Sequence, residues 1–552
     1  MSRPVCIIKN ARFRTMDPAM PVAEAMACSA DGRIQAIGTT EEVMPLSGGG
    51  IRIIDLGGRT VIPGFFDCHL HILWLGANLR HVDLSSPPVT SIAEIVRLLS
   101  CKVADSPGQL CVQGNRYDQN KLSDRAHPDR LDLDKVSDKI PVRIVHTSAH
   151  ASVVNSVGLK MLGIDRDTPD PIAGQIVRDA SGEPTGLLLE TASWSNLERI
   201  LPTPTRDENM EALKRANRYL LERGITSASD ANTLPDHIDL FRNAALSNTL
   251  QVRTNLMVDW GKVISQYDGA VPKPDDLQPD EMNWHRLHVG QAKLFADGAI
   301  TTRTCWLTEP FCDMPDNSGI PMHAPDELLE LIVAAHNAGW QIATHAIGDR
   351  AVDQVLKCYS EAQRIKTRRK PGHRIEHCML LNPELISRLR RQNVWSIGQP
   401  EFLAALGDAY IAALGEERAF RLSPYASLER HDVAQAFSSD CPVVPGNPLA
   451  GVRAAVERIS PNGVVLNGRE RITTESALYA YTAAPAYATF TNRDRGTLEV
   501  GKLADLAVLS IDPLEGAGPM WEALRIESTF IGGECVFGQY ETGLPTAGAA
   551  QP

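Results

Sequence analysis

Short apolar stretches alternate with amphipathic ones through the middle of the chain. WQIATHAIGD and HRIEHC have the composition of buried strands, whereas ENMEALKRANRYLLERG has the apolar spacing of a helix and ends at a glycine. Eight such apolar strands can be counted from VIPGFFDCHLH to AQAFSSDCP, and several follow directly on helix-like segments. This alternation predicts an α/β fold, a (β/α)₈ TIM-like barrel.

The pattern changes at both ends of the chain. Residues 1–62 and 491–540 contain short strand-like segments with glycine turns, and Asp31-Gly32 is typical of a tight hairpin. We therefore expect both termini to build one small β-sandwich domain. The barrel is expected over residues 63–83 and 206–490.

Three further segments stand outside this alternation. Residues 84–205 break it and predict an α/β insertion that covers the barrel mouth. The Pro/Asp-rich stretch 266–285 predicts a loop and is a candidate lid over the active site. The polar, small-residue tail 541–552 is expected to be disordered.

Candidate chemistry lies where the predicted strands end, which is where barrel enzymes place their functional side chains. Two histidines stand two apart in VIPGFFDCHLHILW, and residues i and i+2 of a strand point to one face. The strand ends together supply His69, His71, Lys293, His345, His377 and Asp440. Four imidazoles and a carboxylate suit Zn²⁺, or else iron, manganese or cobalt. A buried lysine has a lowered pKa, and carbon dioxide can convert it to a carbamate that bridges two metals.

Each candidate also has an ordinary structural explanation. A lone histidine at a strand end is often a packed core residue, Lys293 would suit a salt bridge, and Asp440 would suit a helix N-cap. Their joint occurrence in strand order favours a metal centre of one or two ions per chain. Arg303 could anchor a substrate carboxylate, but pairing with a structural acid is favoured.

Aromatic residues near the strand ends are candidates for the substrate pocket. Trp74, Trp306 and Phe402 would line an apolar cavity, and plain core packing is the alternative for each of them. A pocket of this kind predicts a small-molecule substrate.

Composition narrows the class of protein. The 552 residues carry a net charge of −12 without a long Lys/Arg run, so nucleic acid is not an expected partner. No stretch approaches the roughly 18 apolar residues of a membrane span, so no membrane partner is expected either. The 11 cysteines lack framework spacing, which is typical of reduced thiols and predicts a cytoplasmic protein.

Six motifs, taken in order, resemble the metal-dependent amidohydrolase superfamily, and specifically its amidohydrolase-3 or YtcJ-like branch, which includes N-substituted formamide deformylases. The motifs are PGFFDCHLH, KLFADGA, ATHAIGDRAVDQVL, RIEHC, FSSDCPV and GTLEVGKLADLAVL. The resemblance covers roughly residues 1–540.

The resemblance implies a role for each strand-end residue. His69 and His71 would hold a first metal, His345 and His377 a second, and carboxylated Lys293 would bridge them. Asp440 would bind the first metal and serve the attacking hydroxide as general base and then acid. The resemblance also places His150, from the insertion, at the substrate mouth.

The function expected from this resemblance is hydrolysis of a C–N bond in a small organic molecule, in an amide, N-acyl or N-formyl group. One alternative is a carbamate, cyclic amide or ester hydrolase that uses the same centre. Another is a catalytically silent scaffold, whose sign would be lost metal ligands, and here all six are present. Large barrel enzymes often pair, which makes a homodimer the oligomer to test for.

Overall fold

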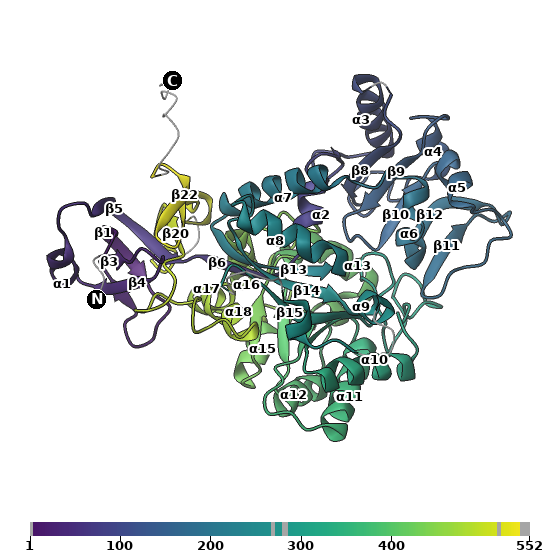
Figure 1. The fold of residues 1–552 in the computed structure, drawn as a ribbon. Coiled ribbons are helices and arrows are strands. Elements are labelled where there is room, and N and C mark those ends of the chain that lie inside the picture. The colour runs from purple at the N-terminus through teal and green to yellow at the C-terminus, as the bar shows by residue number, and fades with distance from the viewer. Residues whose placement is uncertain (1–3, 107, 267–270, 279–284, 516–519, 541–552) are drawn as a thin grey trace.

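Three regions lie side by side in the computed structural model, which describes residues 4–106, 108–266, 271–278, 285–515 and 520–540. In Figure 1 the strands from both chain ends lie on the left, the barrel is in the centre, and the segment inserted after the first barrel strand lies on the right. The barrel therefore separates the terminal sheet from the insertion.

The central region is the predicted parallel barrel. Its neighbouring strands, in spatial order, are β6 (Phe65–Leu70), β13 (Ile225–Thr233), β14 (Arg253–Asp259), β15 (Leu287–Phe295), β16 (Gln341–Ala346), β17 (Arg374–His377), β18 (Trp395–Gly398) and β19 (Gln435–Phe437). The last strand meets the first through single hydrogen bonds: the Asp440 amide donates to the His69 carbonyl at 2.8 Å, and the His71 amide donates to the Cys441 carbonyl at 2.9 Å. The (β/α)₈ prediction is confirmed, and its closing contacts involve three of the candidate site residues.

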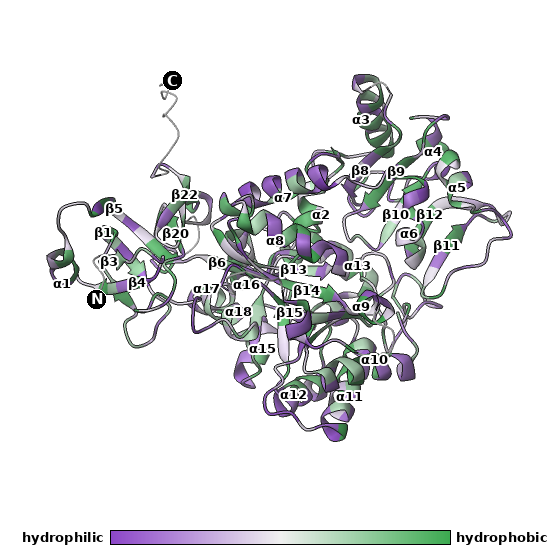
Figure 2. Ribbon diagram, viewed as in Figure 1, coloured by the Kyte–Doolittle hydropathy of each residue, from purple (hydrophilic) through white to green (hydrophobic). Residues whose placement is uncertain are grey.

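Amphipathic helices surround the strands. The main ones are α7 (Arg206–Leu221), α8 (Ile238–Leu246), α10 (Pro325–Ala338), α11 (Asp349–Ile365), α12 (Pro383–Gln392), α13 (Glu401–Leu414) and α16 (Pro448–Glu457). In Figure 2 hydrophobic and hydrophilic residues alternate along them, as expected when one face is buried. Leu220, Phe241 and Val355 are among the buried residues that pack these helices onto the strands. This packing forms the largest core and holds the strand ends in place.

The two chain termini form a second sheet. Its main path runs β22 (Glu534–Gly538), β21 (Ile526–Ile531), β20 (Leu506–Leu509), β5 (Arg52–Pro63), β1 (Cys6–Arg14), β3 (Ala25–Cys28) and β4 (Ile34–Gly38), and β2 (Val22–Ala23) pairs with β1. Segments from the two chain ends also contact each other just before β4 and β20. The Ala504 amide donates to the Gly32 carbonyl at 2.9 Å. Gly32 has a φ of +78°, and a Cβ there would lie 2.9 Å from the Gly532 Cα, so only glycine permits this approach.

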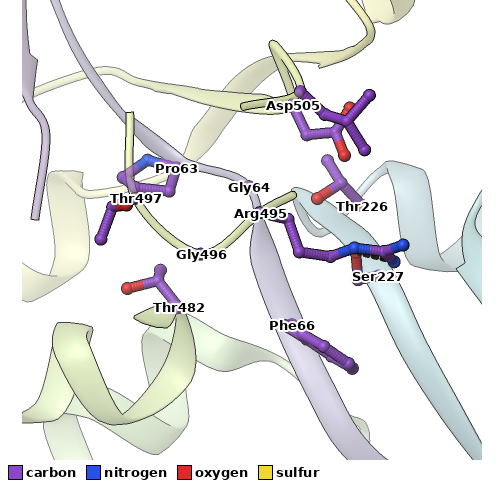
Figure 3. A pocket seen from close by; sticks show the side chains of 11 residues that line it. Pro63, Gly64, Phe66, Thr226, Ser227, Thr482, Arg495, Gly496, Thr497 and Asp505 are labelled. Carbon is purple, nitrogen blue, oxygen red and sulfur yellow. Dashed lines mark hydrogen bonds between the residues drawn. The ribbon is translucent and has the colours of Figure 1, made fainter. Parts of the chain in front are cut away.

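The terminal sheet joins the barrel at the N-terminal ends of the barrel strands. Figure 3 shows this junction, where Arg495 and Asp505 from the terminal region lie near Gly64, Thr226 and Ser227. The Arg495 Nη1 donates to the Ser227 Oγ at 3.3 Å. A Cβ on Gly64 would lie 2.1 Å from the Thr226 Oγ1, so the step from β5 to β6 requires glycine. The junction encloses a cavity of only about 10 Å³.

The insertion has its own mixed sheet, in the order β11 (Gly174–Arg178), β12 (Pro184–Glu190), β10 (Ala151–Val154), β9 (Val142–His146), β8 (Val112–Tyr117) and β7 (Val82–Asp83). Two of its loops contact the barrel. The Gln119 Nε2 donates to the Thr301 carbonyl at 3.3 Å, and the Thr147 Oγ1 donates to the Val443 carbonyl at 2.8 Å. Thr301 and Val443 follow β15 and β19, so the insertion lies against the C-terminal ends of the barrel strands.

The candidate lid at 266–285 does not lie at that end of the barrel. The Trp340 indole donates to the Pro272 carbonyl at 2.8 Å, and the Gln278 Nε2 donates to the Val289 carbonyl at 2.8 Å. Trp340 and Val289 stand near the starts of their strands, so the lid prediction is wrong for residues 271–278. The rest of this stretch, apart from residues 266 and 285, lies outside the described residues, as does the tail 541–552.

Across the described ranges, every helix is either too short or too polar to cross a membrane.

Candidate metal centre

Three buried side chains meet where the barrel strands end. His69 lies near the end of β6, His377 is the last residue of β17, and Asp440 follows β19. One ligand atom from each lies within 4.8 Å of the other two. His377 and Asp440 have positive φ angles of 69° and 59°, which are uncommon for residues with a side chain. Such conformations cluster at functional sites, where the surrounding structure holds them in place.

His71 completes this cluster from the first turn after β6, at the start of α2 (Ile72–Asn78). The Asp440 Oδ1 lies 3.2 Å from the His71 Nε2 and 3.4 Å from the His69 Nε2. That oxygen is buried and accepts no hydrogen bond from any residue the structure describes. A buried carboxylate oxygen without a partner, next to two imidazole nitrogens, is what a cation site requires.

His345 lies beside this cluster but is turned differently. Its ring centroid is 4.4 Å from that of His377. However, its Nε2 lies 3.1 Å from the Gly298 carbonyl and 3.5 Å from the Asp297 Oδ1. The loop after β15 therefore engages this nitrogen, and His345 is a neighbour of the three-residue cluster rather than a member of it.

Lys293 lies on β15 with its amine inside the barrel. Its Nζ is buried, has no hydrogen-bond partner among the described residues, and lies 4.4 Å from the centre of the Phe295 ring. Burial lowers the pKa of Lys293 from 10.5 to about 8, although the nearby Glu376 and Asp440 oppose the shift. The neutral amine is therefore far more abundant near neutral pH than it is for an exposed lysine.

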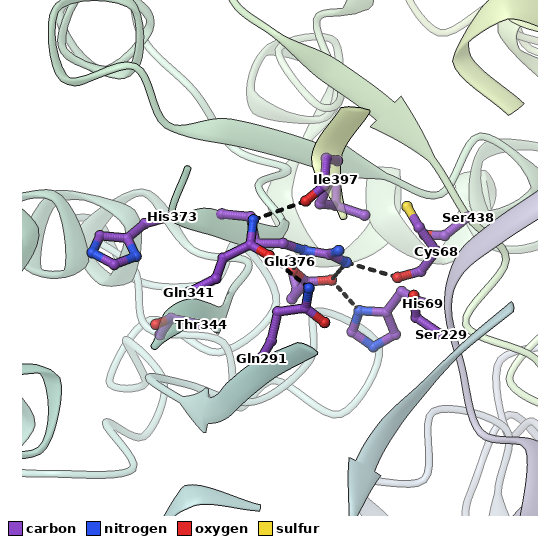
Figure 4. A network of polar contacts seen from close by, with 12 residues as sticks. Cys68, His69, Ser229, Gln291, Gln341, Thr344, His373, Glu376, Ile397 and Ser438 are labelled. Atoms are coloured by element: carbon purple, nitrogen blue, oxygen red, sulfur yellow. Dashed lines mark hydrogen bonds and ion pairs between the residues drawn. The ribbon is translucent and has the colours of Figure 1, made fainter. Parts of the chain in front are cut away.

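A polar network behind the cluster holds His69 in place (Figure 4). The buried Glu376 carboxylate pairs with the His69 Nδ1 and accepts from the Arg374 Nε at 2.5 Å and Nη2 at 2.8 Å. Burial would raise the pKa of Glu376, but the Arg374 charge and the hydrogen bonds from His69 and Arg374 hold it well below its usual value. A carboxylate on Nδ1 fixes the tautomer that leaves Nε2 available to a metal.

Glu376 has a counterpart behind His377. The His377 Nδ1 lies 2.8 Å from the Gln399 Oε1, so its Nε2 also remains available. The sequence interpretation missed both partners. An Arg-x-Glu pair inside the apolar stretch HRIEHC was the available signal, because two charges on one face of a buried strand require partners. No comparable signal marked Gln399.

The four predicted substrate-binding residues occupy different places. His150 and Phe402 line a cavity of about 20 Å³ that also touches His345, His377 and Asp440. The Phe402 ring stacks on His377 at 6.2 Å and 15°. Trp74 does not line this cavity but lies with its ring 5.4 Å from that of His71. Trp306 lies outside the cavity as well, with the Arg350 guanidinium 4.7 Å from its ring.

His150 brings the insertion into the site. Its ring is 5.3 Å from that of His345, and its Nδ1 lies 2.7 Å from the buried Glu190 Oε2. Burial alone would lower the pKa of His150, but the Glu190 charge outweighs it and raises the pKa above the usual value. The insertion thus adds a hydrogen-bonding group beside the barrel cluster.

The donor set suits a divalent metal ion. Burial lowers the pKa of His377 to about 3, lowers that of His69, and places that of His345 well below its usual value. These imidazoles are therefore neutral at pH 7, which is the form that binds metals. Burial would raise the pKa of Asp440, but His71, His69 and His377 hold it well below the usual range, so the carboxylate is ionised.

Comparisons with known proteins identify the family of this chain. The amidohydrolase family model matches residues 52–537. The putative amidohydrolase YtcJ of Bacillus subtilis (strain 168) is 31% identical, with 92% of this chain and 94% of that protein aligned. N-substituted formamide deformylase of Arthrobacter pascens is 28% identical, over 96% of this chain and 97% of that protein.

A solved structure agrees at the level of the whole fold. It belongs to an uncharacterized metal-dependent hydrolase from Pyrococcus horikoshii OT3, with a TM-score of 0.73, 27% identity, and coverage of 93% of this chain and 98% of that one. The family model spans most of the chain, and the barrel presents a cluster suited to a divalent metal. The chain belongs to the amidohydrolase family and is a hydrolase that acts on carbon–nitrogen bonds.

Proposed function

We propose that the chain hydrolyses an amide, N-acyl or N-formyl group of a small organic molecule, with Asp440 as the general base and then acid. The observation that carries this proposal is the unpartnered Asp440 Oδ1, buried beside the His69 and His71 nitrogens. The similarity to a protein named N-substituted formamide deformylase supports this choice of C–N bond.

The proposed metal ligands are the six strand-end residues: His69, His71, Lys293, His345, His377 and Asp440. Zn²⁺ is the proposed ion, at one or two per chain, and iron, manganese or cobalt would suit the same donors. Such an ion, when bound, lowers the pKa of water towards neutrality and polarises the substrate carbonyl.

Asp440 performs the proton transfers in this proposal. Its lowered pKa keeps the carboxylate ionised at neutral pH, so it can accept the proton of the attacking water. After the water oxygen has bonded to the carbonyl carbon, Asp440 delivers that proton to the leaving nitrogen as the C–N bond breaks. His150, held by Glu190, lies with its ring 5.3 Å from that of His345 and is proposed to donate a hydrogen bond to the substrate.

Lys293 is proposed to act as a carbamate. The neutral amine attacks carbon dioxide, a nitrogen–carbon bond forms, and one proton leaves to solvent. The buried Nζ without a partner and the pKa of about 8 support this reaction near neutral pH. The carbamate oxygens would give the site a second anionic ligand beside Asp440, which suits two divalent cations.

The test is hydrolysis by the full-length chain loaded with Zn²⁺ across matched N-formyl, N-acetyl and longer N-acyl amines, alongside carbamates, cyclic amides and esters. Turnover of an N-formyl or N-acyl amine that is lost in Asp440→Asn is the expected result. Turnover confined to carbamates, cyclic amides or esters would overturn the proposed bond. Metal-loaded, folded protein without turnover on any of them would favour a silent scaffold.

A further inference from the structure

Glu190, the last residue of β12 in the insertion, has a strained backbone. Its φ is 50° and its ψ is −127°, a combination that glycine adopts readily and residues with a side chain rarely adopt. The Glu190 side chain is fully buried. Glycine at this position would remove the strain, and strain of this kind clusters at functional sites. The position of the carboxylate is therefore the feature to explain.

Glu190 holds His150 at two points. Its amide donates to the His150 carbonyl at 2.9 Å, and its Oε2 lies 2.7 Å from the His150 Nδ1. An ionised carboxylate only accepts, so the Nδ1 carries the proton and the Nε2 is the nitrogen left for the cavity that His150 lines. The Trp194 indole donates to the Ala149 carbonyl at 2.8 Å, and its ring lies 5.5 Å from that of His150. Neighbours within the insertion thus fix the orientation of the His150 ring.

The second carboxylate oxygen of Glu190 reaches the barrel. The Oε1 is buried and has no hydrogen-bond partner among the described residues. It lies against Gly298, in the loop after β15, where a Cβ would be 2.2 Å from this oxygen and 2.3 Å from the Thr304 Oγ1. The Gly298 carbonyl in turn lies 3.1 Å from the His345 Nε2. Glu190 therefore contacts both the insertion histidine of the cavity and the barrel loop that engages His345.

A buried ion pair that only stabilises the insertion is the alternative role for Glu190. A carboxylate of that kind is expected to have both oxygens bonded, as Asp505 has through Arg253 and the Gly532 amide. Glu190 instead leaves one oxygen without a hydrogen bond and strains its backbone. These two features favour a role in the reaction over a role in stability alone.

We propose that Glu190 is a positioning residue of the hydrolase, which presents the Nε2 of His150 to the substrate and holds the insertion against the loop at Gly298. This inference rests on the proposed function, because it gives His150 a contact with the substrate. Glu190 is not among the residues that line the cavity, so it acts through His150. The insertion then takes part in the reaction of the barrel site.

The test is a double-mutant cycle between Glu190 and His150 in the Zn²⁺-loaded full-length enzyme. Glu190→Met and His150→Phe should each lower kcat/KM about tenfold or more on an amide that the parent hydrolyses. The double variant should match His150→Phe within about twofold, because no imidazole is left to position. A further loss in the double variant as large as that of Glu190→Met alone would overturn the inference. Parent activity in either single variant would overturn it as well.

A second His–Glu pair supplies the matched control. The His323 Nδ1 lies 3.1 Å from the Glu327 Oε1, and the Glu327 side chain is 56% exposed. Glu327→Met should leave kcat/KM unchanged. Glu190→Gln keeps an acceptor for the His150 Nδ1 and should be at least about threefold faster than Glu190→Met. Equal losses in these two Glu190 variants would overturn a positioning role, and Glu190→Ala replaces Glu190→Met if the latter does not fold.

The contact with the barrel loop has its own test. Gly298→Ala should also lower kcat/KM about tenfold, because the new Cβ displaces the Glu190 Oε1. Gly468→Ala is the control, since its Cβ would meet nothing closer than 3.7 Å. Parent activity in folded Gly298→Ala protein would overturn the role of this contact.

Crystal structures separate failure of this inference from failure of the proposed function. An inactive parent on every amide would count against the proposed function. The orientation of the His150 ring in Glu190→Met, compared with that in the parent, then tests Glu190 without turnover. We expect the ring to turn away from its parent orientation. An unchanged ring would overturn the inference.

Discussion

Two pairs of buried charged groups, one at each end of the barrel, differ in their partners. At the N-terminal ends of the strands, Arg253 and Asp505 form a two-pronged ion pair with bonds of 2.5 and 2.9 Å, and the Gly532 amide donates to the same carboxylate at 2.8 Å. At the C-terminal ends, the Lys293 Nζ and the Asp440 Oδ1 are equally buried, yet neither has a hydrogen-bond partner among the described residues.

This difference separates charges that stabilise the fold from charges that we propose bind a ligand. Arg253 and Asp505 neutralise each other where the terminal sheet joins the barrel, so this pair requires no ligand. A buried charge without a partner carries a desolvation cost that a bound ligand can offset, and such groups mark functional sites. Substitutions at the mouth should therefore change chemistry, whereas substitutions at the junction should change stability.

The largest expected effect is at Asp440. Asp440→Asn should lower kcat by at least about a thousandfold, because an amide cannot accept the proton of water at neutral pH. Metal content and melting temperature should stay close to those of the parent, which elemental analysis and calorimetry would check. Activity within tenfold of the parent would contradict the assignment of Asp440 as the base.

Substitution of Lys293 should lower turnover nearly as much, but it should also lower the metal content. Lys293→Ala should lose most of one metal equivalent and about a hundredfold or more of turnover, with partial rescue by a short-chain carboxylic acid. Parent apoenzyme should regain activity faster when bicarbonate accompanies the metal. The exposed Lys262 is the control, since Lys262→Ala should alter neither metal content nor rescue. Full metal content and activity in Lys293→Ala would rule out the carbamate.

Breaking the Arg253–Asp505 ion pair should instead lower stability and leave turnover nearly unchanged. Arg253→Met leaves Asp505 buried without its cation and should cost about 3–5 kcal/mol in the free energy of unfolding, measured in urea. Turnover of the folded fraction should stay within about twofold. The double variant Arg253→Met/Asp505→Leu should recover part of the loss, because neither charge remains. A large loss of kcat in stable Arg253→Met protein would contradict the separation of roles.

The smallest expected effect is at Glu376. This residue is fully paired, as a structural charge is, but it also positions the proposed metal ligand His69. Glu376→Gln should weaken metal affinity by about 10–100-fold while the saturated enzyme keeps much of its turnover. Metal titration against a competing chelator would measure the change. Glu376→Asp, which keeps the charge, should recover part of the affinity. Unchanged affinity in Glu376→Gln would show that Glu376 serves the fold alone.

The sequence allowed the barrel to be predicted because each strand is a short apolar run with a polar residue at its end. It could not show how side chains turn, since that depends on neighbours far along the chain. Glu376 meets His69 across 307 residues, and the Gly298 carbonyl engages the Nε2 of His345. The composition of 266–285 predicted a loop, but which end of the barrel that loop covers depends on Val289 and Trp340.

The pairing of β5 with β20 has a consequence for the order of events during synthesis. β5 leads directly into β6 and its histidines, but the strand that covers its edge, β20, begins only at Leu506. Asp440 also leaves the ribosome long after His69. A nascent or truncated chain that ends before Leu506 therefore carries β5 with one open edge, and open edges favour pairing between chains. The last strands of the protein thus act as protection for the first ones.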